Sequence, residues 1–114
     1  MDYRREYLFL CHGGAKRSPT AVSVAYELAL ERKLNIIAEC GAADSINELN
    51  AAYMARNLSR YEKIIVMDRD IAIKLRALSI VNSRVFCLNI PDKYEKYDTR
   101  LREILRSKLT KLIS

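Results

Sequence analysis

Short apolar runs alternate along the chain with segments in which apolar residues have helical spacing. Residues 7–11, 63–67 and 84–90 are the clearest runs, and residues 34–39 form a shorter one. Nearly continuous apolar runs of this length are typical of parallel strands that are buried on both faces. Strands that alternate with helices predict a parallel sheet with right-handed connections and helices on both faces.

Helices are expected over residues 19–32 and again from near residues 45, 68 and 98. Residues that favour helix starts support the last three: the capping box of Ser45 and Glu48, the pair Asp68 and Asp70, and Asp98 or Thr99. The inner face of the second helix would consist of Ile46, Leu49, Ala52 and Tyr53. The predicted fold is α/β, with three layers (α/β/α), a four-stranded parallel sheet and a single domain over residues 1–114.

The first strand and the first helix are joined by the sequence CHGGAKRSPT, residues 11–20. Gly13 and Gly14 allow successive backbone N–H groups to converge in one concavity. Ser18 is a good N-cap, and Pro19 suits the first helical position. The loop would then lie at the positive end of a helix, where anions bind.

Cys11 begins this segment, and Arg17 follows after five intervening residues. The guanidinium of Arg17 can bind two phosphate oxygens together. A free thiol has a pKa of about 8.5, and positive surroundings at a helix N-terminus lower it to roughly 3.5–7.5. We therefore predict an oxyanion-binding loop with Cys11 as nucleophile. The expected phosphate-binding residues are His12, Gly13, Gly14, Ala15, Lys16, Arg17 and Ser18.

The segment resembles the active-site loop of low-molecular-weight protein tyrosine phosphatases, especially of the short bacterial branch. Two later segments extend the resemblance, IVMD at residues 65–68 and LNIPDKY at residues 88–94. The resemblance implies the phosphotyrosine phosphatase I-like (Rossmann-like) fold. It also implies a cysteine-dependent phosphatase that hydrolyses phosphomonoesters, above all phosphotyrosine, through a phosphocysteine intermediate. The substrate would be a phosphorylated protein or a small phosphoester. No cofactor or metal is expected, since no His/Cys cluster has ligand spacing.

The expected catalytic residues are Cys11 as nucleophile, Arg17 as oxyanion clamp and Ser18 as hydrogen-bond donor to the thiolate. Larger members of the family take their general acid from an Asp-Pro-Tyr segment near the C-terminus. Asp92 matches that segment best, although it can also merely shape a turn. Asp98 is the reserve candidate, and its structural alternative is to cap the final helix.

Other residues have both a functional and a structural interpretation. Tyr94 and Tyr97 are candidates for an aromatic wall beside the substrate, or are ordinary surface residues. His12 is expected to add polarity to the loop without acid–base work. Asp68 could orient loop groups, but a helix N-cap is the simpler interpretation.

Three residues depart from the resembling family. Gly14 stands where members typically carry an Asn that braces the loop; it can adopt the same left-handed backbone but supplies no brace. Lys16 replaces a second cysteine, and Val22 stands where a glutamate often follows. These departures bear on catalytic efficiency more than on phosphate binding.

The chain has 114 residues, a formal net charge of +6 and three cysteines. An odd number of cysteines without paired spacing argues for a reducing compartment. Residues 1–6 lack the features of a signal peptide, and no apolar run approaches the ~20 residues that span a bilayer. We therefore expect a cytoplasmic protein without a membrane partner. The basic residues are scattered, so nucleic acid is not the expected partner. The sequence predicts no oligomeric state.

Two other functions are compatible with the same loop. The chain could bind phosphate or phosphotyrosine without turnover, because the Asn brace is missing and two acids compete. Arsenate reductase uses the same scaffold but needs further thiols to resolve the cysteine–arsenic adduct. The segment 68–82 contains no cysteine, so only Cys40 and Cys87 could serve.

Overall fold

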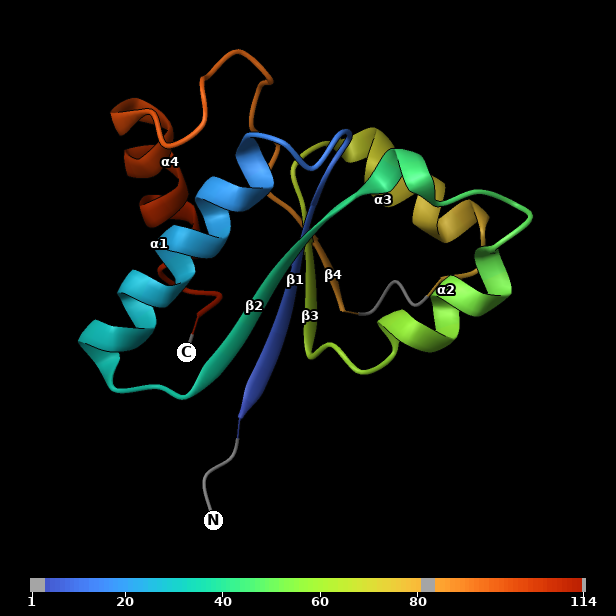
Figure 1. Cartoon of the computed structure of the whole chain (residues 1–114), viewed down its shortest axis with the longest axis horizontal. Coiled ribbons are helices and arrows are strands. Elements are labelled where there is room, and N and C mark those ends of the chain that lie inside the picture. Colours follow the sequence, from blue (N-terminus) through green and yellow to red (C-terminus); the bar gives the residue numbers. More distant parts are fainter. Residues whose placement is uncertain (1–3, 81–83, 114) are drawn as a thin grey trace.

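Parallel strands form one sheet in the computed structural model, which describes residues 4–80 and 84–113 (Figure 1). The strands are β1 (Arg5–Cys11), β2 (Ile36–Ala42), β3 (Lys63–Val66) and β4 (Val85–Cys87). Their order across the sheet is β2-β1-β3-β4, and each neighbouring pair is parallel. The helices are α1 (Arg17–Arg32), α2 (Ala51–Leu58), α3 (Arg69–Ala77) and α4 (Thr99–Leu109). The predicted α/β fold with a four-stranded parallel sheet is confirmed.

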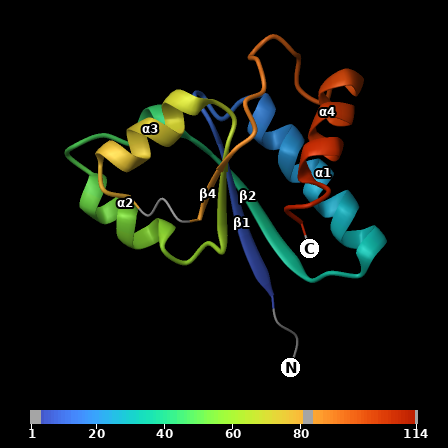
Figure 2. The same ribbon diagram turned by 180° about the vertical axis from the view of Figure 1, so that it is seen from behind.

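The helices cover both faces of the sheet. Figure 1 and Figure 2 show α1 and α4 together on one face and α2 and α3 on the other. Each pair of helices packs on its own cluster of buried side chains. The three-layer arrangement is therefore confirmed as well. Within the described residues, no helix has both the length and the apolar character that crossing a membrane requires.

Side chains of β1 alternate between the two faces of the sheet. Tyr7, Phe9 and Cys11 belong to the cluster under α1 and α4. Leu8 and Leu10 belong to the cluster under α2 and α3. All five side chains are at most 5 % exposed. The strand is thus buried on both faces, as its uninterrupted apolar pattern predicts.

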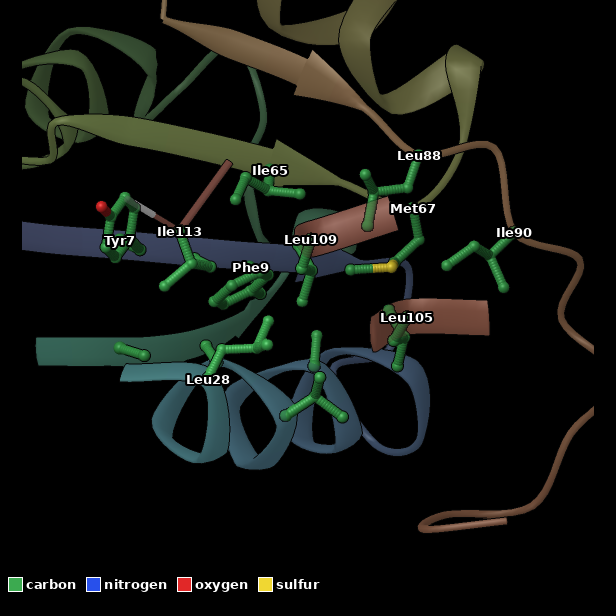
Figure 3. Close-up of a cluster of buried hydrophobic side chains, with 14 of the residues drawn as sticks. Tyr7, Phe9, Leu28, Ile65, Met67, Leu88, Ile90, Leu105, Leu109 and Ile113 are labelled. Carbon is green, nitrogen blue, oxygen red and sulfur yellow. The ribbon is translucent and has the colours of Figure 1, made fainter. Parts of the chain in front are cut away.

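The cluster under α1 and α4 fixes the two elements that flank the Cys11 loop. In Figure 3, Phe9 of β1 lies near Leu28 of α1 and Leu109 of α4. Ile65 and Met67 extend the same cluster from β3 and the residue after it. Full burial of one such side chain contributes about 1.5–3 kcal/mol. The end of β1 and the start of α1 are therefore held by the core and not by the loop itself.

The second helix begins later than the predicted capping box at Ser45 implies. The N-cap of α2 is Asn50, and Ser45 ends a short 3₁₀ turn. The Asn47 side chain accepts hydrogen bonds from two backbone N–H groups, and Asn50 bonds in turn to the backbone of Asn47 and Ser45. Such local bonds compete with helix formation. The prediction that Leu49, Ala52 and Tyr53 face the core is consequently wrong, because all three are exposed.

Strand boundaries differ from prediction at both outer strands. The backbone at Lys33 is left-handed (φ 57°), and the N–H of Leu34 donates to a carbonyl in the last turn of α1. Leu34, which the apolar pattern assigns to a strand, therefore belongs to the turn that ends α1. The structure therefore has β2 over 36–42 instead of 34–39, and β4 is shorter than the predicted run over 84–90.

Candidate active site

Cys11 is the last residue of β1 and lies at the carboxyl edge of the sheet, where open α/β sheets bind ligands. Its side chain is 3 % exposed. A small pocket of about 140 Å³ is lined by Cys11, Gly13, Ala15, Lys16, Arg17 and Asp92. The fold thus brings together the predicted nucleophile, four of the seven predicted phosphate-binding residues and the predicted acid, whereas His12, Gly14 and Ser18 do not line the pocket.

The first helix begins at Arg17, one residue before the predicted N-cap. Lys16 occupies the N-cap position and Ser18 lies within the first turn, so the capping role predicted for Ser18 is wrong. The Ser18 side chain is fully buried, and its Oγ has no hydrogen-bond partner among the described residues. Pro19 still fits, because N–H groups of a first turn have no partner within the helix. Ser18 is free to donate a hydrogen bond to an acceptor that arrives at the site.

Arg17 is almost completely buried and is held by two of its nitrogen atoms. Nη1 donates to Asp68 Oδ1 at 2.8 Å and to the backbone carbonyl of Ile90 at 2.6 Å. Nη2 lies 2.8 Å from Asp68 Oδ2, so the two side chains form a bidentate ion pair. Burial by itself lowers the pKa of Arg17, but hydrogen bonding to Asp68 and the charges of Asp68 and Asp92 raise it above its ordinary value.

Among residues 4–80 and 84–113, no hydrogen bond to the Nε edge of the guanidinium is present. The bonds to Asp68 and Ile90 use both hydrogens of Nη1 and one hydrogen of Nη2. The hydrogen of Nε and the second hydrogen of Nη2 remain, and they project side by side. Nε lies 3.7 Å from Asp92 Oδ1, and both residues line the pocket. These two donors have the parallel geometry that two phosphate oxygens need.

His12 lies among three carboxylates. Its Nδ1 is 3.1 Å from Asp44 Oδ1, and its Nε2 is 3.2 Å from Asp68 Oδ2 and 3.1 Å from Asp70 Oδ2. The hydrogen bond to Asp44 raises the pKa of His12, and the charges of Asp70 and Asp68 add to this against the lowering effect of burial. Sequence reasoning misses Asp44 in this group. The signal that could find it is its position just after a strand end, where parallel strands gather polar groups.

Asp68 occupies the N-cap position of α3, but its side chain makes no capping hydrogen bond. The carboxylate instead contacts Arg17 and His12, which both follow β1. Charged donors bind a carboxylate more strongly than a neutral backbone N–H does. Asp68 is therefore the N-cap residue of α3, as predicted, but its side chain does not act as the cap. The alternative interpretation, that Asp68 orients groups of the loop, agrees with the contacts.

The two candidate acids have different surroundings. Asp92 lines the Cys11 pocket, and its side chain is 64 % exposed. Asp98 caps α4, because its Oδ1 accepts hydrogen bonds from the N–H groups of Arg100 and Leu101. The structural alternative for Asp98 is confirmed, and Asp92 is the candidate acid that lies beside the thiol.

Neither Tyr94 nor Tyr97 is among the residues that line the Cys11 pocket. Tyr94 packs partly buried against the cluster under α1 and α4 and borders a separate depression with Asp98. The backbone of Tyr97 is left-handed (φ 63°), and its N–H donates to Thr20 Oγ1 at 3.0 Å. A substrate wall formed by these tyrosines stays a prediction.

Gly14 adopts the left-handed backbone predicted for its position, with φ 70°. A Cβ on Gly14 would lie 3.1 Å from the carbonyl carbon of Gly41 and 3.2 Å from the nitrogen of Ala42. Gly41 and Ala42 end β2, beyond the strand predicted over residues 34–39. The close approach leaves no room for the Asn of the resembling family. The end of β2 supports the loop where that side chain would lie.

Replacing Gly14 by alanine is expected to lower the free energy of unfolding by about 1–3 kcal/mol, because a side chain is strained at positive φ and meets the β2 backbone. Thermal or urea unfolding measures the loss. Gly13→Ala is the matched control, since a Cβ on Gly13 meets nothing within 4 Å. Equal destabilisation by both substitutions would contradict this explanation.

No protein-family model matches the sequence, and no curated protein matches it. Solved structures do match, at low identity. A protein tyrosine phosphatase from Entamoeba histolytica is 19% identical with a TM-score of 0.73, over 96% of this chain and 94% of that chain. A low molecular weight phosphotyrosine phosphatase from Vibrio cholerae is 18% identical with a TM-score of 0.72, over 96% and 94%.

A third match is the arginine phosphatase YwlE, known from Bacillus subtilis. Its Cys-to-Ser mutant with a phosphorylated active site serine is 14% identical, with a TM-score of 0.71 over 95% of this chain and 93% of that chain. All three similarities extend over nearly the whole length of both chains. The resemblance seen in the sequence is thereby confirmed for the architecture. The chain has the fold of the low molecular weight protein tyrosine phosphatases.

Proposed function

We propose that the chain hydrolyses phosphomonoesters, with phosphotyrosine as the expected substrate, through a phosphocysteine intermediate. The observation that carries the proposal is the pocket shared by Cys11, Arg17 and Asp92. A thiol, a free pair of guanidinium donors and a carboxyl group are the nucleophile, the oxyanion clamp and the acid that this reaction needs.

In the first displacement, the thiolate of Cys11 attacks phosphorus. The S–P bond forms while the bond from phosphorus to the leaving oxygen breaks. The free Nε and Nη2 hydrogens of Arg17 and the N–H groups of the loop hold the equatorial oxygens. Protonated Asp92 donates its proton to the leaving oxygen, so the product departs as a neutral alcohol or phenol.

In the second displacement, water attacks phosphorus and the S–P bond breaks. The Asp92 carboxylate accepts a proton from this water, and inorganic phosphate leaves. The electron pair of the S–P bond returns to Cys11, which is again a thiolate. The buried hydroxyl of Ser18, which lacks a partner among the described residues, is available to donate a hydrogen bond to that charge.

The activities named for the similar structures support this class of reaction. The Entamoeba histolytica protein is a protein tyrosine phosphatase, and YwlE is an arginine phosphatase. In the Cys-to-Ser mutant of YwlE, the active site serine carries a phosphoryl group. We carry over from them phosphoryl transfer to Cys11, with a phosphorylated protein or a small phosphoester as substrate. A cytoplasmic location, inferred from the cysteines, completes the proposal.

Release of inorganic phosphate from an aryl phosphate by the purified chain tests the proposal. Alkylation of Cys11, identified by mass spectrometry, should also be slowed by inorganic phosphate, whereas alkylation of the exposed Cys40 and Cys87 should not. If phosphate protected Cys11 but no phosphate were released from the substrate, the chain would be a phosphate-binding module and not an enzyme. Absence of both effects would contradict the site altogether.

Replacing Asp92 by asparagine is expected to slow hydrolysis most for substrates with poor leaving groups. An unactivated leaving oxygen needs the proton, so an alkyl phosphate should lose about 10²-fold or more in kcat/KM. A nitrophenyl phosphate should lose less than about 10-fold from the same change, because its leaving group departs without a proton. Steady-state kinetics with the two substrates measures this difference.

Asp98→Asn is the matched control for Asp92→Asn. Asparagine caps helices about as well as aspartate does, so this variant should keep both its stability and its turnover. If Asp98→Asn lost more kcat/KM than Asp92→Asn on the substrate with the poor leaving group, Asp98 would be the general acid and Asp92 would not.

The positions of the other cysteines argue against arsenate reductase. Cys40 lies on β2 and Cys87 on β4, which are the two outer strands of the sheet. Neighbouring strands are about 4.8 Å apart, so three spacings place these residues about 14 Å from each other. Two cysteines form a disulfide only when their Cα atoms lie within about 7 Å. A relay of thiols through Cys40 and Cys87 therefore does not fit this fold.

A further inference from the structure

Three potential ligand atoms meet beside the active-site loop, and the proposed hydrolysis uses none of them as a reacting group. They are His12 Nε2, Asp68 Oδ2 and Asp70 Oδ2, which all lie within 4.8 Å of one another. His12 follows β1, whereas the two aspartates follow β3. Because β1 and β3 are neighbours in the sheet, the fold creates a proximity that spacing in the sequence does not reveal.

The separations of these atoms suit a shared cation. Zn²⁺, as an example, binds imidazole nitrogen and carboxylate oxygen at about 2.0–2.2 Å in a tetrahedral arrangement, so two of its ligands lie roughly 3.4 Å apart. His12 Nε2 lies 3.2 Å from Asp68 Oδ2 and 3.1 Å from Asp70 Oδ2. The two distances from the imidazole are therefore those of neighbouring ligands of one ion.

Asp44 orients the imidazole for this role. Its Oδ1 lies 3.1 Å from His12 Nδ1, the nitrogen on the opposite side of the ring from the cluster. The carboxylate can accept a hydrogen bond from Nδ1–H, and in that neutral tautomer the lone pair is on Nε2. That lone pair then faces the oxygens of Asp68 and Asp70, which also carry negative charge. A positive ion between the three atoms removes the repulsion.

We propose that His12, Asp68 and Asp70 bind a divalent first-row transition-metal ion, with Asp44 as the residue that orients His12. One imidazole and two carboxylates, without sulfur, suit ions such as Mn²⁺ and Zn²⁺. The side chains of His12 and Asp70 are 39% and 66% exposed, so water can fill the remaining coordination positions.

The ion shares Asp68 with Arg17. Each carboxylate oxygen has two lone pairs, so Oδ2 can bind the ion while it accepts the hydrogen bond of Arg17 Nη2. None of the three ligand residues lines the Cys11 pocket. Its role is to fix His12 and Asp68, and through Asp68 the guanidinium, and not to activate water. Binding of the ion does not require turnover, so the two can be measured separately.

Titration of the full chain with Mn²⁺, followed by the electron paramagnetic resonance signal of the free ion, tests the proposal. Mn²⁺ is the probe because it favours oxygen and nitrogen ligands over the thiols of this chain. We expect one saturable site. His12→Ala and Asp70→Asn should weaken it at least about 10-fold, and Asp44→Asn by about 10-fold to 100-fold, the range typical of groups that orient a ligand.

Two further variants separate this site from others. Glu103→Gln removes one exposed carboxylate of α4 and should leave Mn²⁺ affinity unchanged. Cys11→Ser should also bind Mn²⁺ like the unmodified chain, so failure of the proposed hydrolysis and failure of this site remain distinct results. Absence of saturable binding would overturn the proposal. Equal affinity in His12→Ala, with its fold verified by thermal unfolding, would overturn it as well. A proton on Nε2 would then be the group that joins the carboxylates.

Discussion

Replacing Cys11 by serine is expected to reduce turnover of an aryl phosphate by at least about 10⁴-fold, as removal of a catalytic nucleophile does in other enzymes. A serine hydroxyl attacks phosphorus only when a base removes its proton. The one imidazole of the chain, His12, contacts three aspartates instead of serving as that base. Steady-state kinetics with a nitrophenyl phosphate measures the loss.

The same variant should keep its affinity for phosphate. The N–H groups of the loop and the guanidinium of Arg17 do not depend on the sulfur, so calorimetric titration with inorganic phosphate should still show binding. Cys40→Ser is the matched control, because Cys40 is exposed on β2 and should keep full activity. If Cys11→Ser retained more than about 1 % of the turnover, the nucleophile would have to be another residue.

The part of the site that lies on contiguous sequence could be predicted from sequence alone. Cys11, the glycines and Arg17 belong to one strand–loop–helix unit, and each has a local physical reason to be there. The start of α1 was less accessible to local reasoning, since Ser18 has the residue type of an N-cap. Its side chain is buried in the first turn instead, because the core fixes where the helix lies.

The part of the site that depends on neighbouring strands could not be predicted in the same way. Asp68 has the sequence signature of a helix cap, and the sequence suggests only that it could orient loop groups, without indicating Arg17 as its partner. The bond exists because β1 and β3 are adjacent and end at the same edge. The room left at Gly14 likewise depends on β2, which approaches the loop from its other side.

Replacing Arg17 by lysine is expected to lower kcat/KM by about 10²-fold to 10³-fold, the loss typical of removing an oxyanion donor. Lysine keeps the positive charge but provides neither the bidentate pair with Asp68 nor the side-by-side donors of Nε and Nη2. The free energy of unfolding should fall by about 1–3 kcal/mol, because the carbonyl of Ile90 and the carboxylate of Asp68 lose hydrogen bonds in a largely buried region.

Asp68→Asn separates the two roles of Arg17. This substitution removes the charge that holds the guanidinium but leaves the Nε and Nη2 donors in the chain. It should therefore lower kcat/KM by only about 10-fold, with most of the change in kcat, since orientation of the clamp matters most in the transition state. Arg100→Lys, on the exposed surface of α4, should change neither activity nor stability. If Arg17→Lys cost no more than Arg100→Lys, charge alone would suffice at this position, and the guanidinium geometry would have no part in the reaction.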